Sequence, residues 1–305
     1  MAELDTLLSA AIVTMVGINA LTGLYVVRRL KPIPPRSQAG TAQETEDDGK
    51  EDEEHDEDEE KASEKEKILA RRSQLIRELE EERGTRIITL IHRKEPWSTD
   101  DDEAEIVLED SETILQEVRE TPRDKPIDFI LHTEGGLTFA ADMMAMALKH
   151  HPAKVTVMVP FYAMSSGTYM ALAADEIMME KYSILAPVEP QIDEMPANWI
   201  MAILKRKPVE TIADRTILLA EKARMEAENA SEFVKWLLAD KMAEEQAGQV
   251  ANFLVGGFMA STTPITLDVA RAIGLNVTEG VPEKVHQLFE TIEFGTGVKP
   301  GKSYQ

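Results

Sequence analysis

The sequence predicts an α/β protein with a parallel sheet, joined to an N-terminal membrane-spanning helix. Two observations carry this prediction. Short apolar segments alternate with helical segments between residues 86 and 188, which is the order expected of parallel βαβ units. Before them, residues 6–27 hold no charge over 22 positions, and a helix of that length crosses a hydrocarbon core of about 30 Å.

The charges that flank the apolar stretch predict its orientation. Glu3 and Asp5 precede it, and three basic residues follow within 28–31. The positive-inside rule then places the C-terminal side in the cytoplasm. A cleaved signal peptide is the competing interpretation, but it requires basic residues before the apolar run. We therefore expect residues 1–31 to be a single-pass anchor with a basic flank, in a membrane protein whose catalytic domain is cytoplasmic.

Three segments outside the globular part differ in composition. Residues 32–61 begin rich in proline and continue into a block, 44–60, with thirteen acidic residues and one lysine; such a segment repels itself and is predicted to be a disordered linker. Residues 62–83 combine apolar positions at helical spacing with many charges and are predicted to be a helical stalk. Residues 296–305 form a tail.

Composition excludes several classes of function. The net charge is −23, which argues against nucleic acid as a partner, because phosphates need lysine and arginine to neutralise them. The chain has no cysteine, so thiol chemistry, disulfides and cysteine-ligated zinc are excluded. Neither a HExxH nor a GxSxG pattern occurs. We therefore expect no metal and no cofactor.

Residues 84–295 are predicted to form the globular domain. Its strands are rich in β-branched and aliphatic residues and its helices in alanine, leucine and methionine. The predicted strands are 86–93, 126–133 and 153–160, with shorter strand-like pieces at 177–180 and 183–188. The predicted helices are 110–120, 137–151 and 165–176; residues 198–256 are mostly helical, and a last turn, helix and strand occupy 263–280.

Two loops follow neighbouring predicted strands and each opens a helix. The first contains Gly135 and Gly136, and the second contains Ser165, Ser166 and Gly167. The carboxyl ends of parallel strands form the edge where α/β proteins bind ligands. The simplest interpretation of the serines is a helix N-cap. The alternative is that Ser165 is a nucleophile, while the N–H groups of Gly136 and Ser166 bind the oxyanion that forms on a carbonyl substrate.

A serine nucleophile needs a base, and none of the six histidines stands out as one. A desolvated lysine is the alternative, because burial lowers the pKa of an amine. An apolar stripe at helical spacing runs through 230–238, and its next position is Lys241. Lys205 and Lys222 are the other candidates. A lysine at the end of a buried stripe also commonly reaches solvent without a catalytic role.

The motifs "PIDFILHTEGG", "VPFYAMSSGTYMALAADEIMM", "PVEPQI" and "LLADKM" resemble the serine dehydrogenase proteinase family. These proteins are related to the SppA-type signal peptide peptidases of the Clp protease/crotonase superfamily. The resemblance covers residues 81–277 and implies a spiral of ββα units with a Ser–Lys dyad. By position it implies Ser165 as nucleophile, Gly136 and Ser166 at the oxyanion hole, and a base at or beside Lys241. Glu189 and its neighbours stand where a Clp-type histidine would be expected.

The residues and the resemblance together predict a membrane-anchored serine protease that hydrolyses peptide or membrane-protein substrates. We expect a homo-oligomer, because this fold usually completes its sites by packing subunits together. Serine dehydrogenase activity is not expected, since nothing in the sequence is suited to pyridoxal phosphate or a nicotinamide. Two alternatives remain: a non-catalytic membrane scaffold of the same fold, and a crotonase-type acyl-CoA enzyme that uses carboxylates in place of Ser165 and Lys241.

Overall fold

The computed structural model describes residues 50–93, 95, 105–257 and 263–292. The chain divides into two compact units, 1–67 and 68–305, and the account below concerns the second. The predicted anchor, 1–31, and the tail, 296–305, lie outside the described residues. Within the described ranges, no helix combines the length and apolar character that a membrane span requires.

Helix α2, Lys50–Arg83, begins inside the segment predicted to be a disordered linker. Lysine and glutamate are good helix formers, and no proline interrupts this stretch, so the backbone can extend the predicted stalk toward the N-terminus. The end of α2 belongs to the folded domain, because Leu75 and Leu79 are fully buried. The domain therefore begins at about Ile68, earlier than the predicted Gly84.

A five-stranded parallel sheet forms the centre of the domain, in the order β1-β2-β3-β5-β10. Every residue of β2 and β3, two of the three inner strands, is buried, so both faces of these strands are covered. This confirms the predicted α/β class with a parallel sheet. The strands are β1 Arg86–Ile91, β2 Ile127–His132, β3 Val155–Val159, β5 Glu176–Met179 and β10 Val277–Glu279.

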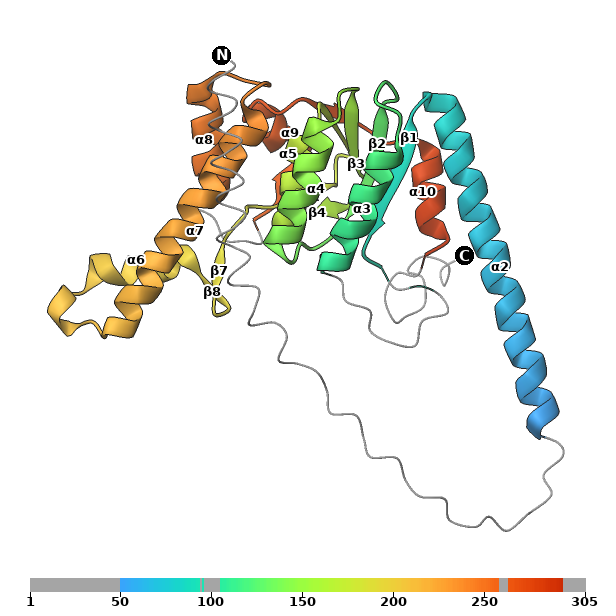
Figure 1. Ribbon diagram of the computed structural model, residues 1–305, viewed down its shortest axis with the longest axis horizontal. Coiled ribbons are helices and arrows are strands. Elements are labelled where there is room, and N and C mark those ends of the chain that lie inside the picture. The colour runs from blue at the N-terminus through green and yellow to red at the C-terminus, as the bar shows by residue number, and fades with distance from the viewer. Residues whose placement is uncertain (1–49, 94, 96–104, 258–262, 293–305) are drawn as a thin grey trace, which may run out of the picture. The chain divides into compact units, whose positions relative to one another are not determined.

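Helices cover the two faces of this sheet and bury two separate apolar clusters (Figure 1). Side chains of β2 alternate between them: Phe129 belongs to the larger cluster and Ile130 to the smaller one. The larger cluster lies under helices α3, α4, α5, α7, α8 and α9, and the smaller one under α2 and α10. The bounds are α3 Leu108–Glu120, α4 Thr138–His150, α5 Ser166–Ala173, α7 Asp214–Leu238, α8 Glu244–Val255, α9 Leu267–Ala272 and α10 Glu283–Glu290.

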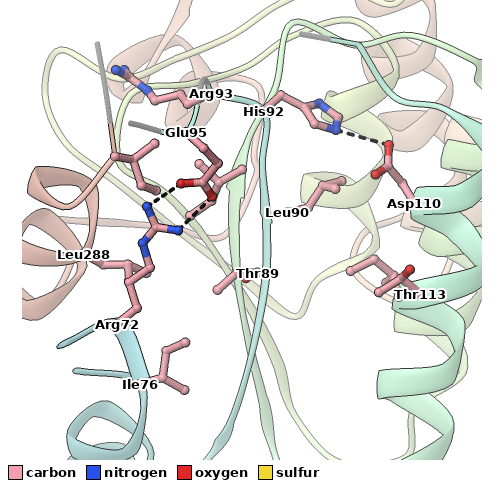
Figure 2. A pocket seen from close by; sticks show the side chains of 13 residues that line it. Arg72, Ile76, Thr89, Leu90, His92, Arg93, Glu95, Asp110, Thr113 and Leu288 are labelled. Atoms are coloured by element: carbon pink, nitrogen blue, oxygen red, sulfur yellow. Dashed lines mark hydrogen bonds and ion pairs between the residues drawn. The ribbon is translucent and has the colours of Figure 1, made fainter. Parts of the chain in front are cut away.

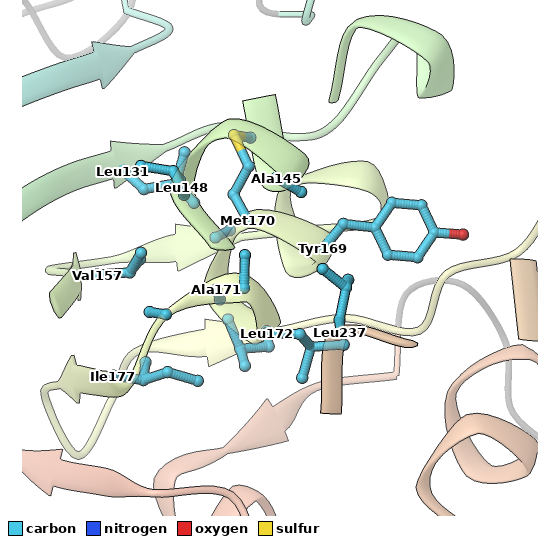
Figure 3. Packing of buried hydrophobic residues seen from close by; sticks show 14 of the residues in the cluster. Leu131, Ala145, Leu148, Val157, Tyr169, Met170, Ala171, Leu172, Ile177 and Leu237 are labelled. Atoms are coloured by element: carbon cyan, nitrogen blue, oxygen red, sulfur yellow. The ribbon is translucent and has the colours of Figure 1, made fainter. Parts of the chain in front are cut away.

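Helix α5 is buried along its whole length, as the apolar run after Gly167 predicts. Leu172 packs near Leu237 of α7, and Ala171 lies above the strands that carry Val157 and Ile177 (Figure 3). The predicted stripe of α7 is also confirmed, because Val234 and Leu237 are fully buried. Packing on several sides fixes the position of α5, and therefore of the loop that precedes it.

The remaining elements surround this core. They include a three-stranded sheet of β4, β6 and β9 and a hairpin of β7 and β8. Helix α6 packs against α7 around buried Ile200 and Ala223. The bounds are β4 Tyr162–Ala163, β6 Ile184–Leu185, β7 Gln191–Ile192, β8 Met195–Pro196, α6 Ala197–Arg206, a 3₁₀ turn Val209–Thr211, and β9 Ile265–Thr266.

Candidate active site

The structure brings together the two loops that the sequence singles out. Strands β2 and β3 are parallel neighbours, so the loops after them meet at one edge of the sheet. Thr133 and Ala163 form a parallel bridge, and the N–H of Met164 donates to the carbonyl of Thr133 at 3.0 Å. A Cβ added to Gly135 would lie 2.9 Å from the Cβ of Ser165. Glycine at this position is what allows the loops to approach so closely.

Ser165 has a strained backbone at the mouth of α5. Its φ is 50° and its ψ is −122°, a conformation that costs a non-glycine residue on the order of 1–3 kcal/mol. The residue precedes the first turn of α5, but its side chain caps no helix N–H. The N-cap interpretation therefore does not account for its hydroxyl. The side chain is half-buried, so a substrate can reach it.

Ser166 ties the two loops together. Its side chain is buried, and its Oγ donates to the carbonyl of Gly136 at 3.1 Å. Behind it, Gly167 packs closely against the first loop, because an added Cβ would lie 2.6 Å from Cγ2 of Thr133. The hydroxyl of Ser166 is thus engaged in structure, while that of Ser165 makes no hydrogen bond to any described residue.

Two backbone N–H groups beside Ser165 have no partner among the described residues: those of Gly136 and Ser166. Ser166 N–H is at the start of α5, where helix N–H groups lack acceptors within the helix. Gly136 has a φ of 141°, and the carbonyl of Gly135 before it accepts from Ile106 N–H at 2.6 Å. Since a trans peptide holds its C=O and N–H in opposite directions, this bond directs Gly136 N–H away from Ile106.

The structure does not bring Lys241 to Ser165 within one chain. Lys241 follows the end of α7, and its Nζ donates to the carbonyl of Leu172 at 2.5 Å. Leu172 lies at the opposite end of α5 from Ser165. The two residues are seven positions apart, or about 10 Å at a helical rise of 1.5 Å per residue. Burial, together with the charge of Lys149, lowers the pKa of the Lys241 amine to about 8.

The other two candidate lysines lie on the neighbouring helices. Lys205 is on α6 and Lys222 on α7, and both are exposed. Neither makes a hydrogen bond or an ion pair with any residue that the structure describes. Their amines are therefore available to a substrate or to another protein copy. No described lysine is hydrogen-bonded to Ser165.

A histidine and an aspartate that the sequence did not mark as a site lie behind the first loop. His92 follows β1, and its Nδ1 lies 2.8 Å from Oγ1 of Thr133. Its Nε2 lies 3.2 Å from Oδ2 of Asp110 (Figure 2). Burial alone would raise the pKa of Asp110, but hydrogen bonds from His92 and from the N–H of Val107 lower it. The sequence does not indicate this contact, because His92 and Asp110 are 18 positions apart and only the fold brings them together.

Two further acidic groups have raised pKa values. Asp142 on α4 has an enclosed Oδ1 without a partner among the described residues. Burial, together with the charge of Glu226, raises the pKa of its carboxyl to about 8. Burial also raises the pKa of Glu189, the residue where a Clp-type histidine would be expected. Among the described residues, no three His, Asp or Glu side chains are grouped so that they could hold a metal ion.

Known proteins of similar sequence and structure were found. Two uncharacterised proteins of Methanocaldococcus jannaschii are each 42% identical to this chain, over 238 residues (77% of this chain, 81% of that protein) and 221 residues (72% and 77%). Among solved structures, a variant of a membrane-bound stomatin-specific protease is similar at 15% identity and a TM-score of 0.40, covering 61% of this chain and 79% of that one. ClpP1 from Listeria monocytogenes is similar at 13% identity and a TM-score of 0.40, covering 64% and 92%.

A family model covers most of the chain. The model described as ClpP-like SDH-type serine proteinase matches residues 60–304. The match includes both loops, all the strands of the parallel sheet and the three candidate lysines. It confirms the resemblance that the motifs around Gly136 and Ser165 predict. The chain belongs to the ClpP-like SDH-type serine proteinase family, and it is a peptidase of the hydrolase class.

Proposed function

We propose that this protein is a membrane-anchored serine peptidase in which Ser165 is the nucleophile. The observation that carries the proposal is the pair of N–H groups on Gly136 and Ser166, which lack partners among the described residues and flank Ser165. Preorganised donors of this kind stabilise the negative charge that forms on a carbonyl oxygen. The loss of one such donor typically costs about 100- to 1,000-fold in kcat.

The proposed reaction has two stages. In the first, Oγ of Ser165 attacks the peptide carbonyl while a base takes the hydroxyl proton. The tetrahedral oxyanion lies between the N–H groups of Gly136 and Ser166. It then collapses to an ester on Ser165, and the base returns the proton to the leaving amine. In the second stage, water attacks the ester and the same base takes a proton from the water. The base then gives this proton to Oγ of Ser165 as the ester C–O bond breaks and the acid product leaves.

We propose that the base is a lysine, with Lys241 as the first candidate. A pKa of about 8 leaves roughly one Lys241 amine in ten uncharged at pH 7. To act, the amine must leave the carbonyl of Leu172 and approach Ser165. Lys205 and Lys222 are the alternatives, because their exposed amines can be presented to Ser165 of another copy.

The anchor and the assembly complete the proposal. Residues 6–27 would hold the domain at the cytoplasmic face of a membrane, where extended segments of membrane or misfolded proteins would bind by strand addition beside Ser165. Large apolar side chains are exposed on helices α6 and α7: Trp199 is 71% exposed and Leu218 is 70% exposed. Exposed apolar groups of this size support assembly of several copies through α6 and α7.

Labelling with a fluorophosphonate probe tests the nucleophile. We expect Ser165→Ala to abolish labelling and peptidase activity, because the probe forms a bond to an activated Oγ. Ser166→Ala is the matched control: it removes a neighbouring hydroxyl that donates to Gly136 and should leave labelling detectable. Circular dichroism of both variants checks folding. Labelling that persists in Ser165→Ala would refute the assignment, and a wild type that binds acyl-CoA but never labels would favour the crotonase-type alternative.

A further inference from the structure

We propose that His92 and Asp110 form a positioning pair that holds Gly136 N–H in place through the hydroxyl of Thr133. The inference rests on the proposed function, in which Gly136 N–H binds the oxyanion. None of the three side chains is proposed to touch the substrate. Their role is to keep the donor peptide in one orientation during the reaction.

A continuous chain of hydrogen bonds links Asp110 to the first loop. Oδ2 of Asp110 accepts from the N–H of Val107 at 2.9 Å and lies 3.2 Å from Nε2 of His92. Nδ1 of His92 lies 2.8 Å from Oγ1 of Thr133. The same Oγ1 accepts from the N–H of Gly135 at 3.1 Å. His92 and Asp110 line a cavity of about 280 Å³ on the side of the loop that faces β1 and α3 (Figure 2).

The hydrogens in this chain can be placed so that every donor has an acceptor. Gly135 N–H can only donate, so Oγ1 of Thr133 must accept from it. The Thr133 hydroxyl hydrogen is then free to donate to Nδ1 of His92. That leaves the imidazole hydrogen on Nε2, which donates to the carboxylate of Asp110. In this arrangement every donor has an acceptor. The Thr133 hydroxyl also lies 3.4 Å from the carbonyl oxygen of Gly135; if it donates there, Nδ1–H of His92 donates to Oγ1 instead, and the chain still links Asp110 to the first loop.

The chain fixes a peptide that would otherwise be free to rotate. Gly135 and Gly136 have φ values of 112° and 141°, and two successive glycines allow many backbone conformations. Thr133 holds the N–H of Gly135, and Ile106 N–H holds its carbonyl at 2.6 Å. The N–H of Gly136 belongs to the same peptide unit as that carbonyl. Bonds on both sides of Gly135 therefore set the direction of the proposed oxyanion donor.

Thr133 offers the cleanest test, because Asp110 also accepts from Val107 at the start of α3 and its replacement would disturb that helix. Thr133 is fully buried. Valine has nearly the same shape but lacks the hydroxyl, whereas serine keeps the hydroxyl and loses a methyl group. Thr133→Val thus removes the hydrogen bonds with packing retained, and Thr133→Ser does the reverse. His92→Leu removes the next member of the chain.

The experiment measures peptide hydrolysis and hydrogen exchange of residues 133–137 in the full-length protein. We expect Thr133→Val and His92→Leu each to lower kcat by about 10- to 100-fold with KM within about twofold, since a misdirected donor loses part of the stabilisation that a deleted one loses entirely. Thr133→Ser should stay within about threefold of the wild type. The double variant should be no worse than Thr133→Val alone, because both act through one chain. Amide exchange in 133–137 should be faster in Thr133→Val but not in Thr133→Ser.

Several results would overturn the inference. They are an unchanged kcat in Thr133→Val, an equal loss in Thr133→Ser and Thr133→Val, a change confined to KM, or unchanged exchange of the loop. A wild type that neither labels at Ser165 nor cleaves peptides refutes the proposed function instead. The exchange measurement still decides in that case whether Thr133 and His92 hold the loop.

Discussion

The two ends of helix α5 differ in which groups of the proposed reaction they hold. At its start, Ser165 has a strained backbone and two N–H groups beside it lack partners among the described residues. At its end, the carbonyl of Leu172 accepts from the amine of Lys241. The helix dipole favours a cation at a C-terminus and an anion at an N-terminus. The proposed nucleophile and the proposed oxyanion donors thus lie together in one chain, whereas the amine of Lys241 is held at the opposite end of α5 by a bond to the carbonyl of Leu172.

This comparison separates two questions that a Ser–Lys dyad usually combines. The position of Ser165 beside the N–H groups of Gly136 and Ser166 depends on glycines and on close contact between the two loops. The structure contains both. The delivery of a base depends on Lys241 leaving Leu172, or on Lys205 or Lys222 of another copy. Four predictions follow in order of decreasing expected effect; three test the two ends of α5 separately, and one tests the buried carboxyl of Asp142 on α4.

Gly136→Ala should have the largest effect. Its new Cβ would lie 2.3 Å from the backbone N of Ile106, at a φ of 141° that alanine rarely adopts. We expect kcat to fall about 1,000-fold, because the donor peptide must move, and the thermal midpoint to fall as well. Gly248→Ala on α8 is the control, since its Cβ would meet nothing within 4 Å and alanine stabilises a helix by roughly 0.5–1 kcal/mol. Normal activity in Gly136→Ala would remove Gly136 from the oxyanion hole.

Lys241→Met tests the other end of α5. If Lys241 is the base, kcat should fall by at least about 100-fold while the KM for the peptide changes little. Lys205→Met and Lys222→Met are matched variants, because both amines are exposed and lack partners among the described residues. Full peptidase activity in Lys241→Met would exclude Lys241 and transfer the role to whichever of the other two variants is inactive.

Asp142→Asn should stabilise the protein and weaken the dependence of its stability on pH. The pKa of Asp142 is raised from 3.8 to about 8, so the unfolded chain releases this proton at a lower pH than the folded one. The free energy of unfolding therefore decreases as the pH rises from about 4 to about 8. The increase in the free energy of unfolding that Asp142→Asn causes should therefore grow over this pH range, to at most roughly 6 kcal/mol. Urea unfolding at pH 5 and pH 8 measures it, and an equal effect at both values would contradict the prediction.

Replacing exposed apolar residues of α6 and α7 should have the smallest effect on the reactivity of Ser165. Trp199→Ser with Leu218→Ser removes two large exposed side chains. We expect a smaller assembly in analytical ultracentrifugation, while fluorophosphonate labelling changes less than about threefold, because the oxyanion donors belong to the same chain as Ser165. If labelling is lost together with the assembly, the reactivity of Ser165 requires a second copy of the chain, which would contradict the prediction.

Much of the fold was predictable from the sequence, because local patterns determine it. The alternation of apolar and helical segments predicted the parallel sheet and the helices of the core. It also predicted that the loops at Gly136 and Ser165 would meet, since parallel neighbouring strands end at one edge. The burial of Leu75 and Leu79 in the domain was missed, because the apolar positions of 62–83 lie among many charges and were interpreted as a stalk.

The remaining parts of the site depend on long-range contacts that local patterns do not encode. Periodicity placed Lys241 at the next position of the apolar stripe in 230–238, but it does not say which end of α5 the amine reaches. The contact of His92 with Thr133 joins residues 41 positions apart. A strand-end histidine and an aspartate at a helix start are each common, so neither indicated a pair.

The most direct measurement of the central claim is peptide mapping by mass spectrometry after reaction of the full-length protein with a fluorophosphonate. The account predicts one adduct per chain, located on Ser165, and its absence from Ser165→Ala. An adduct on another residue, or none on a folded wild type, would contradict it.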